Sequence, residues 1–218
     1  MKKLNNGSII KRMVFIAAFS AITCVLYYFA KFNLPFFPSF LDINFSMVPI
    51  IIAAFMLGPW DALIIIIIRC LIKLPASGTG YVGEMADVLI GITASLPAGF
   101  IYKKCNFKYK GLVAFLSVII GWVAMGVISN IFINVPWYST FYFGQNYYTE
   151  GVPAPLVGMC NDAFKIISFN HCPTISKDNF MFYYVFLAVI PFNLFLSVIV
   201  VLITALVHKR LKTLYDMI

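Results

Sequence analysis

The sequence is poor in charged residues and in the side chains that most enzymes use. Only 11% of its 218 residues are charged, whereas a soluble domain carries about 25%. Histidine occurs only at His171 and His208, and the five cysteines include no CxxC pair. The glycine-lysine loop of ATPases and the GxSxG and HExxH motifs of hydrolases are also missing. The sequence therefore predicts that the protein is not an enzyme, with no catalytic residues, metal site or cofactor.

The sequence is instead rich in apolar residues. Hydrophobic residues make up 62% of the chain, and the mean hydropathy is +0.93. A soluble core of this length cannot hide so much apolar surface, but a bilayer can. The net charge is +8, and the basic residues stand at the ends of apolar segments, which indicates membrane orientation rather than nucleic-acid binding. We predict an all-α membrane protein with a single membrane domain over residues 1–218.

Five apolar runs are long enough to cross about 30 Å of hydrocarbon. They cover residues 13–32, 47–74, 81–102, 111–135 and 181–207. The run 47–74 is long for one span and contains Gly58-Pro59, a turn signal, because proline interrupts the helical hydrogen-bond ladder. It is therefore either one kinked span or two short helices.

The basic clusters favour two helices. Eleven of the 16 Lys and Arg residues fall in three groups, within residues 2–12, 103–110 and 209–212. All three groups lie on the cytoplasmic side only if an even number of spans separates them. The prediction is six transmembrane helices with both termini cytoplasmic: 13–32, 47–58, 60–74, 81–102, 111–135 and 181–207, with a long outer loop over 136–180.

Some charged residues fall at membrane depth, where they are costly. Arg69, Glu84 and Asp87 lie on consecutive predicted helices. One interpretation is an ion pair of Arg69 with Glu84 or Asp87 that joins two helices. The other is that these groups line a solute cavity, with Glu84 and Asp87 on one helix face because they are three residues apart.

Two asparagines and two aromatic segments can likewise be interpreted either as structural groups or as parts of a ligand site. Asn130 and Asn193 each lie near a proline at the outer end of a helix, and either bind a polar ligand or join helices. The outer segments 32–45 and 137–148 are rich in aromatic rings, which form either an interfacial belt or the walls of a pocket. In the long outer loop, Cys160 and Cys172 are candidates for a disulfide.

Several segments, in order along the chain, resemble the riboflavin-binding S components of energy-coupling factor (ECF) vitamin transporters. Residues 40–49, Phe-Leu-Asp-Ile-Asn-Phe-Ser-Met-Val-Pro, are similar to a family segment that runs much like FLKIDFSDVP. Residues 83–91 resemble the family pattern GELANFxIG. The stretch from Asn130 to Pro136 resembles NYYxxxP, and residues 190–194 resemble the start of LPFNLIKG.

The resemblance implies a six-helix subunit that captures a vitamin outside the cell and docks on a transmembrane coupling protein with two ATP-binding subunits. Such a subunit resides in the bacterial cytoplasmic membrane and topples within it to release the vitamin. The segment that holds Phe40 and Asn44 would contact the vitamin, through the backbone of Leu41 and Ile43, together with Asn130 and Asn193. Ala17 and Ala21, a small-residue pair on the first helix, match the family's docking patch for the coupling protein.

The sequence departs from the family at positions near the expected ligand. Leu196 stands where riboflavin binders have a ligand-contacting lysine, and Met47 and Asn44 replace two aspartates. A riboflavin-like flavin is the predicted substrate, and pantothenate or another B vitamin is the alternative within the same class. A membrane scaffold subunit that binds no solute is the alternative from a different class.

Overall fold

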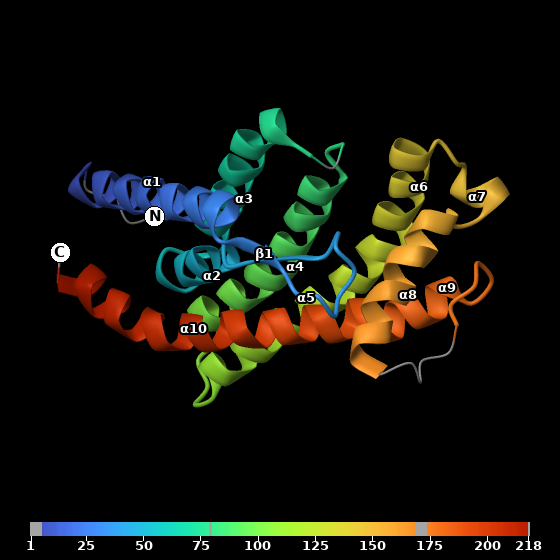
Figure 1. Cartoon of the computed structure of the whole chain (residues 1–218). Coiled ribbons are helices and arrows are strands. Elements are labelled where there is room, and N and C mark those ends of the chain that lie inside the picture. Colours follow the sequence, from blue (N-terminus) through green and yellow to red (C-terminus); the bar gives the residue numbers. More distant parts are fainter. Residues whose placement is uncertain (1–5, 79, 169–173, 218) are drawn as a thin grey trace.

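The computed structural model describes residues 6–78, 80–168 and 174–217. Most of them are helical, in a bundle that Figure 1 shows from the side. The helices are α1 (Asn6–Phe29), α2 (Met47–Met56), α3 (Pro59–Lys73), α4 (Val82–Lys104), α5 (Lys110–Ser129), α6 (Val135–Phe143), α7 (Tyr147–Glu150), α8 (Ala154–Ser168), α9 (Phe180–Tyr183) and α10 (Ile190–Met217). A 3-10 turn, η1 (Leu74–Ala76), and two π-helical segments, η2 (Asn130–Asn134) and η3 (Tyr184–Val189), complete the helical elements.

One element of the described chain departs from the all-α prediction. Strands β1 (Lys31–Asn33) and β2 (Asp42–Asn44) form an antiparallel pair in which Phe32 lies opposite Ile43. Pro35 and Pro38 keep the connecting segment out of a helix. The Asn33 amide donates to the Ser39 carbonyl and the Asp42 carboxylate, both at 2.6 Å. These bonds join the two ends of the segment that connects the strands.

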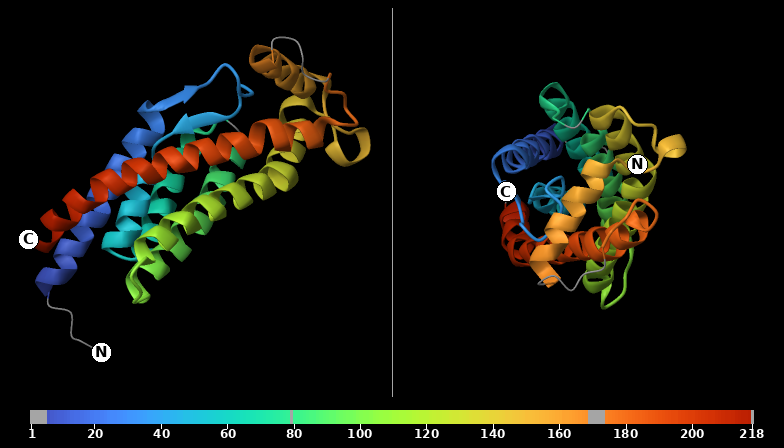
Figure 2. Two further views of the ribbon diagram at one scale, coloured as in Figure 1. Left: turned by 90° about the horizontal axis from the view of Figure 1, so that it is seen from below. Right: turned by 45° about the vertical axis from the view of Figure 1, so that its right-hand side comes forward.

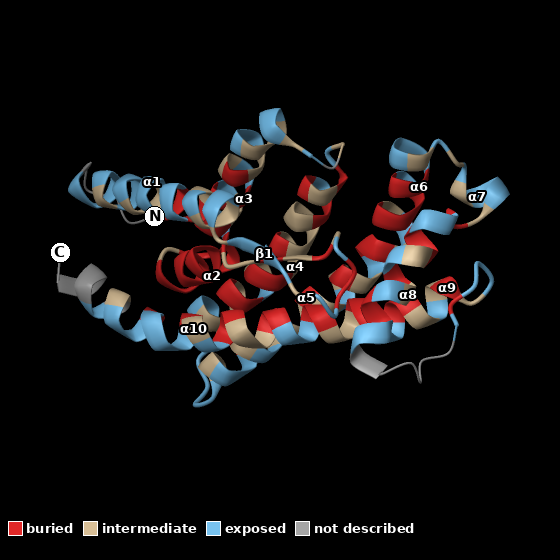
Figure 3. Cartoon of the chain, in the orientation of Figure 1, coloured by how far each residue is buried: buried red, intermediate tan, exposed pale blue. Residues whose placement is uncertain are grey.

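The run 47–74 is two helices in the structure. Between α2 and α3, Gly58 has φ of 132°, a value that other residues rarely adopt, and Pro59 begins α3 at a position where its missing N–H costs nothing. All ten residues of α2 are buried, and the helix contacts α1, α3, α4 and α10 (Figure 3). Because it is apolar on every side, α2 is an interior helix without a lipid-facing surface.

Within the described residues, four helical stretches are long and apolar enough to cross a membrane: Gly7–Phe29, Val82–Lys104, Lys110–Phe143 and Phe180–Leu211. The first begins before the predicted residue 13. Arg12 is accommodated because its guanidinium binds the buried Asp61 carboxylate at 2.7 and 2.8 Å. The last two include the π segments η2 and η3, and the Lys110–Phe143 stretch continues past residue 135, where the predicted helix ended. The predicted outer loop 136–180 accordingly begins with α6 and also contains α7 and α8.

Basic segments that are far apart in the sequence meet at one end of the bundle. The start of α1 and the end of α10 lie there in Figure 1 and in the left view of Figure 2. Lys103 Nζ donates to the Met56 carbonyl at 2.6 Å, and His208 Nε2 lies 3.0 Å from Tyr102 Oη, which ties the α4–α5 turn to the ends of α2 and α10. We call this the basic end. The opposite end carries α6, α7, α8 and α9.

Candidate substrate-binding site

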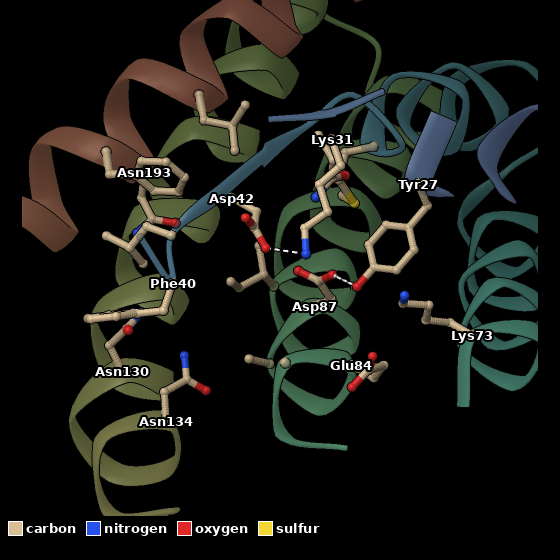
Figure 4. A pocket seen from close by; sticks show the side chains of 18 of the residues that line it. Tyr27, Lys31, Phe40, Asp42, Lys73, Glu84, Asp87, Asn130, Asn134 and Asn193 are labelled. Atoms are coloured by element: carbon tan, nitrogen blue, oxygen red, sulfur yellow. Dashed lines mark hydrogen bonds and ion pairs between the residues drawn. The ribbon is translucent and has the colours of Figure 1, made fainter. Parts of the chain in front are cut away.

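A cavity of about 330 Å³ lies among α1, the β-hairpin, α3, α4, α5 and α10 (Figure 4). Its volume is within the range of small-molecule sites, about 300–1,000 Å³. The polar and aromatic residues that line it are Tyr27, Lys31, Phe40, Asp42, Asn44, Arg69, Lys73, Glu84, Asp87, Trp122, Asn130, Asn134, Tyr138, Phe192 and Asn193. The cavity therefore has a lining that combines charge, amides and aromatic rings.

One wall is built from amides and rings. Asn193, at the start of α10, accepts a hydrogen bond from Trp122 Nε1 at 3.2 Å and donates to the Val189 carbonyl at 2.8 Å. Asn130 accepts from Tyr184 Oη at 2.6 Å and donates to the Gly126 carbonyl at 2.8 Å. Both amides are thus held in fixed orientations, and they were the two asparagines that the sequence singled out.

The two π-helical segments determine where the residues of this wall lie. Asn130 begins η2 and Tyr184 begins η3, so the hydrogen bond between them joins the two segments. Single π turns inside long helices are frequent at functional sites, because they displace side chains from the regular helical stripe. The sequence offers no simple signal for them.

The opposite wall is ionic. Tyr27 Oη donates to the Asp87 carboxylate at 2.5 Å, and Lys31 forms an ion pair with Asp42 (Figure 4). Glu84 accepts from Ser77 Oγ at 2.8 Å. Because each carboxylate has a hydrogen-bonded or charged neighbour, the cost of holding it at membrane depth is reduced.

Arg69 does not form the ion pair that the sequence left open. Its side chain is only 3% exposed, and it donates to Ser46 Oγ at 2.7 Å and to the main-chain carbonyl of Asp87 at 3.2 Å. Ser46 Oγ in turn donates to Asn44 Oδ1 at 2.6 Å. Arg69 therefore supports both the start of α2 and the backbone of α4, and it also lines the cavity.

Charge in the cavity is balanced. Its cations are Lys31, Arg69 and Lys73, and its carboxylates are Asp42, Glu84 and Asp87. With three of each, the formal charges cancel, so the described lining carries no net charge that would favour an anion or a cation. Such a site suits an uncharged ligand that makes many hydrogen bonds.

A second cavity, of about 410 Å³, adjoins the first and shares Phe40, Asp42 and Tyr138 with it. Its other walls are Ser39, Tyr142, Phe143 and, from α8, Leu156 and Met159. It is mostly apolar and aromatic. The rings of Phe40 and Tyr138, 6.1 Å apart, lie between the two cavities. The outer aromatic segments thus supply cavity walls, although Trp137, Phe141 and Tyr148 are exposed.

The structure brings most of the predicted site residues together. Phe40, Leu41, Asn44, Glu84, Asp87, Asn130 and Asn193 all line the first cavity. Ile43 does not, because its side chain lies in the hydrophobic core. Sequence reasoning missed Tyr27, Lys31 and Trp122. Trp122 had one available signal, since it stands in the middle of an apolar helix rather than at an interface, where membrane tryptophans collect.

The other predicted residues lie elsewhere. Ala17 and Ala21 are exposed on the outer face of α1. Cys160 is a buried free cysteine on α8, and its proposed partner Cys172 lies outside the described residues.

A helical bundle with apolar outer faces and a polar cavity inside defines a membrane-embedded, solute-binding protein. The model of the family "ECF transporter, substrate-specific component" matches residues 11–208, and the chain belongs to this family. It is therefore an integral membrane component of a transporter rather than an enzyme. The family implies a vitamin substrate and, as partners, the coupling and ATP-binding subunits of an ECF transporter.

Individual relatives agree with the family. The riboflavin transporter RibU of Staphylococcus aureus (strain TCH60) is 29% identical over 202 residues, which are 92% of this chain and 90% of that protein. The riboflavin transporter FmnP of Bacillus subtilis (strain 168) is 26% identical over 209 residues, 93% of each chain. A solved S component of a bacterial ECF transporter is 26% identical, covers 94% of this chain and 96% of its own, and superposes with a TM-score of 0.60.

Proposed function

We propose that this chain captures riboflavin at the outer face of a bacterial cytoplasmic membrane and releases it inward. The observation that carries the proposal is the cavity of about 330 Å³ with balanced charge, fixed amides and aromatic walls. Riboflavin is an uncharged molecule with a flat ring system and a polyhydroxyl chain. The rings suit Phe40, Trp122 and Tyr138, and the hydroxyl groups suit the carboxylates and amides. The names of the relatives support the same substrate.

The balanced charge disfavours the alternative substrate, pantothenate. Pantothenate is a carboxylate, and its binding would leave one negative charge in excess among Asp42, Glu84 and Asp87. Leu196 lines the cavity at the position where the resemblance leads one to expect a lysine. The cavity therefore has no extra cation there to offset an anionic ligand, and it also lacks one contact that the riboflavin binders of the resemblance make.

The membrane orientation follows from the basic end. We propose that this end faces the cytoplasm, because basic segments concentrate on that side. The chain then passes from side to side six times, with α2 and α3 as the second and third passes. The ten residues of α2 extend only about 15 Å, which is short for a span, but α2 is enclosed by other helices and does not meet lipid.

Docking on the coupling protein is proposed for the outer face of α1. Ala17 and Ala21 are exposed there, and small residues let a partner helix approach closely. The two ATP-binding subunits act through that coupling protein, since the sequence of this chain has no ATP-binding loop.

Ligand titration of the purified protein tests the substrate. Riboflavin should bind and lose its fluorescence as it enters the aromatic cavity, and Trp122 should be quenched in parallel. Pantothenate should not compete. Binding of pantothenate but not riboflavin would assign the alternative, and no ligand from a panel of B vitamins would contradict the transport role itself.

A further inference from the structure

Cations from two distant parts of the sequence gather at the basic end, in a group that we call the cationic patch. Its members lie on the end of α4, the α4–α5 turn, the start of α5 and the last part of α10: Lys104, Lys108, Lys110, Lys209 and Arg210. Lys110 Nζ lies 5.7 Å from the centre of the Tyr102 ring, and Tyr102 Oη lies 3.0 Å from His208 Nε2. The turn and the last part of α10 therefore present their charges in one region of the surface.

The charge of the cationic patch is not neutralised by carboxylates. None of the five side chains forms an ion pair with a residue that the structure describes. Asp61, the carboxylate described at this end, is 1% exposed and bonded to Arg12. Lys110 is half-buried and the other four cations are exposed (Figure 3). The cationic patch thus carries an excess of positive charge at the surface, in contrast to the balanced lining of the cavity.

Aromatic rings accompany the cationic patch. Lys104 Nζ lies 4.9 Å from the centre of the Phe100 ring, and Lys108 Nζ lies 5.5 Å from the centre of the Tyr109 ring. The exposed Trp60 packs against Phe100 with ring centres 5.9 Å apart. In membrane proteins, tryptophan and tyrosine collect where the hydrocarbon meets the lipid headgroups. The rings therefore indicate that the patch lies at the depth of the headgroups.

We propose that the cationic patch binds the headgroup of an anionic phospholipid. A phosphodiester carries one negative charge and free oxygens that accept hydrogen bonds from ammonium and guanidinium groups. Basic sites between transmembrane helices on the cytoplasmic side bind headgroups of this kind. A zwitterionic lipid brings its own cation and gains less from the patch. The site is separate from the cavity, so the inference does not depend on which vitamin the chain captures.

Lipid binding to the full chain, purified in a neutral detergent, tests the site. The probes are phosphatidylglycerol, which is anionic, and phosphatidylcholine, which is zwitterionic, with identical acyl chains. Native mass spectrometry counts the lipids retained, and thermal unfolding measures their effect on stability. Phosphatidylglycerol should be retained and should raise the unfolding temperature at concentrations where phosphatidylcholine does neither. Added salt should weaken its binding, because the attraction is electrostatic.

A charge-matched pair of variants locates the site. Lys104→Gln combined with Lys108→Gln removes two cations of the patch and should weaken phosphatidylglycerol on the order of tenfold or more. Lys165→Gln combined with Lys177→Gln is the matched control, because it removes the same charge from exposed positions at the opposite end. The control should bind phosphatidylglycerol as the native chain does.

The contribution of α10 has its own variant. Lys209→Gln combined with Arg210→Gln should weaken phosphatidylglycerol by a similar factor if the two segments form one site. Both side chains are exposed, so the lipid-free variant should unfold within about two degrees of the native chain. If the Lys104 and Lys108 variant does not fold, this variant carries the same comparison.

Three results would overturn the inference. The first is a native chain that retains the two lipids equally, and the second is a patch variant that prefers phosphatidylglycerol as strongly as the control does. The third is displacement of phosphatidylglycerol by an equal concentration of glycerol phosphate, which would indicate a site for soluble phosphates. None of these results bears on riboflavin titration, so the inference and the proposed function fail independently.

Discussion

At the scale of single residues, the cavity depends on close contacts that leave no room for extra atoms. Asn193 is held between the Trp122 indole and the Val189 carbonyl, and it lies directly over Gly126. A Cβ atom at position 126 would lie 2.6 Å from Asn193 Cγ and Oδ1. Glycine is therefore required there because the amide occupies the place of a side chain.

Gly126→Ala should weaken riboflavin binding on the order of tenfold, because the new methyl group displaces the Asn193 amide and breaks its bond to Trp122. Isothermal titration or flavin fluorescence measures the effect. Gly111→Ala, on the same helix, is the control, since its Cβ would meet only Tyr102 at 3.9 Å. Unchanged affinity of the Gly126 variant would show that the position of Asn193 does not matter for binding.

At the scale of elements, the helices approach one another most closely where α4 meets α5. The Thr93 carbonyl on α4 lies 2.4 Å from the place that a Cβ on Gly121 would take, and Thr93 Oγ1 donates to the Gly121 carbonyl at 3.3 Å. In lipid, no hydrophobic effect draws helices together, so such small-residue contacts supply much of the free energy of helix association. This contact also positions two walls of the cavity, because Asp87 stands on α4 and Trp122 on α5.

Gly121→Ala should therefore destabilise the protein by about 1–3 kcal/mol through overpacking. The melting temperature in detergent should fall by several degrees, whereas Gly111→Ala should leave it unchanged or raise it slightly, since alanine is the better helix former. A Gly121 variant as stable as the native chain would mean that α4 and α5 separate without cost.

The outer helix α8 offers a test through its cysteine. Burial raises the pKa of the Cys160 thiol to about 12. At pH 8 the thiol is therefore almost entirely protonated, and only the thiolate reacts with maleimide. In a variant whose other four cysteines are serine, labelling at pH 8 should be at least about a hundredfold slower in the folded protein than after denaturation, where the pKa returns to about 8.5. Equal rates in the two states would show that α8 does not cover Cys160.

At the scale of the whole molecule, the surfaces proposed for substrate binding and for docking are separate. The cavity is enclosed by the helices, whereas Ala17 and Ala21 face outward on α1. Binding and assembly should therefore be separable by mutation.

Ala17→Leu and Ala21→Leu should leave riboflavin affinity within about twofold of the native value and abolish co-purification with the coupling protein, because the larger side chains hold a partner helix away. Leu206→Phe, on the exposed face of α10, is the control and should preserve assembly. Intact complexes in both alanine variants would place the docking surface elsewhere. Loss of riboflavin binding would show that α1 also shapes the cavity.

The membrane class of the protein, the break at Gly58 and seven of the cavity residues could be read from the linear chain. The reason is that apolar runs, a Gly-Pro pair and short family segments such as residues 40–49 are local signals. Bilayer thickness turns run length directly into a prediction of crossing. The basic clusters could likewise be grouped before any contact between them was known.

Only the tertiary structure decided how the polar residues are used. Tyr27 pairs with Asp87 across 60 positions, and Trp122 with Asn193 across 71, so each pairing depends on how two distant helices are rotated about their axes. The same rotation turns Arg69 toward Ser46 and the Asp87 carbonyl instead of a carboxylate, and leaves Asn134 Oδ1 unpaired. Hydrophobic periodicity cannot predict that angle in a membrane, because lipid accepts apolar residues on every face of a helix.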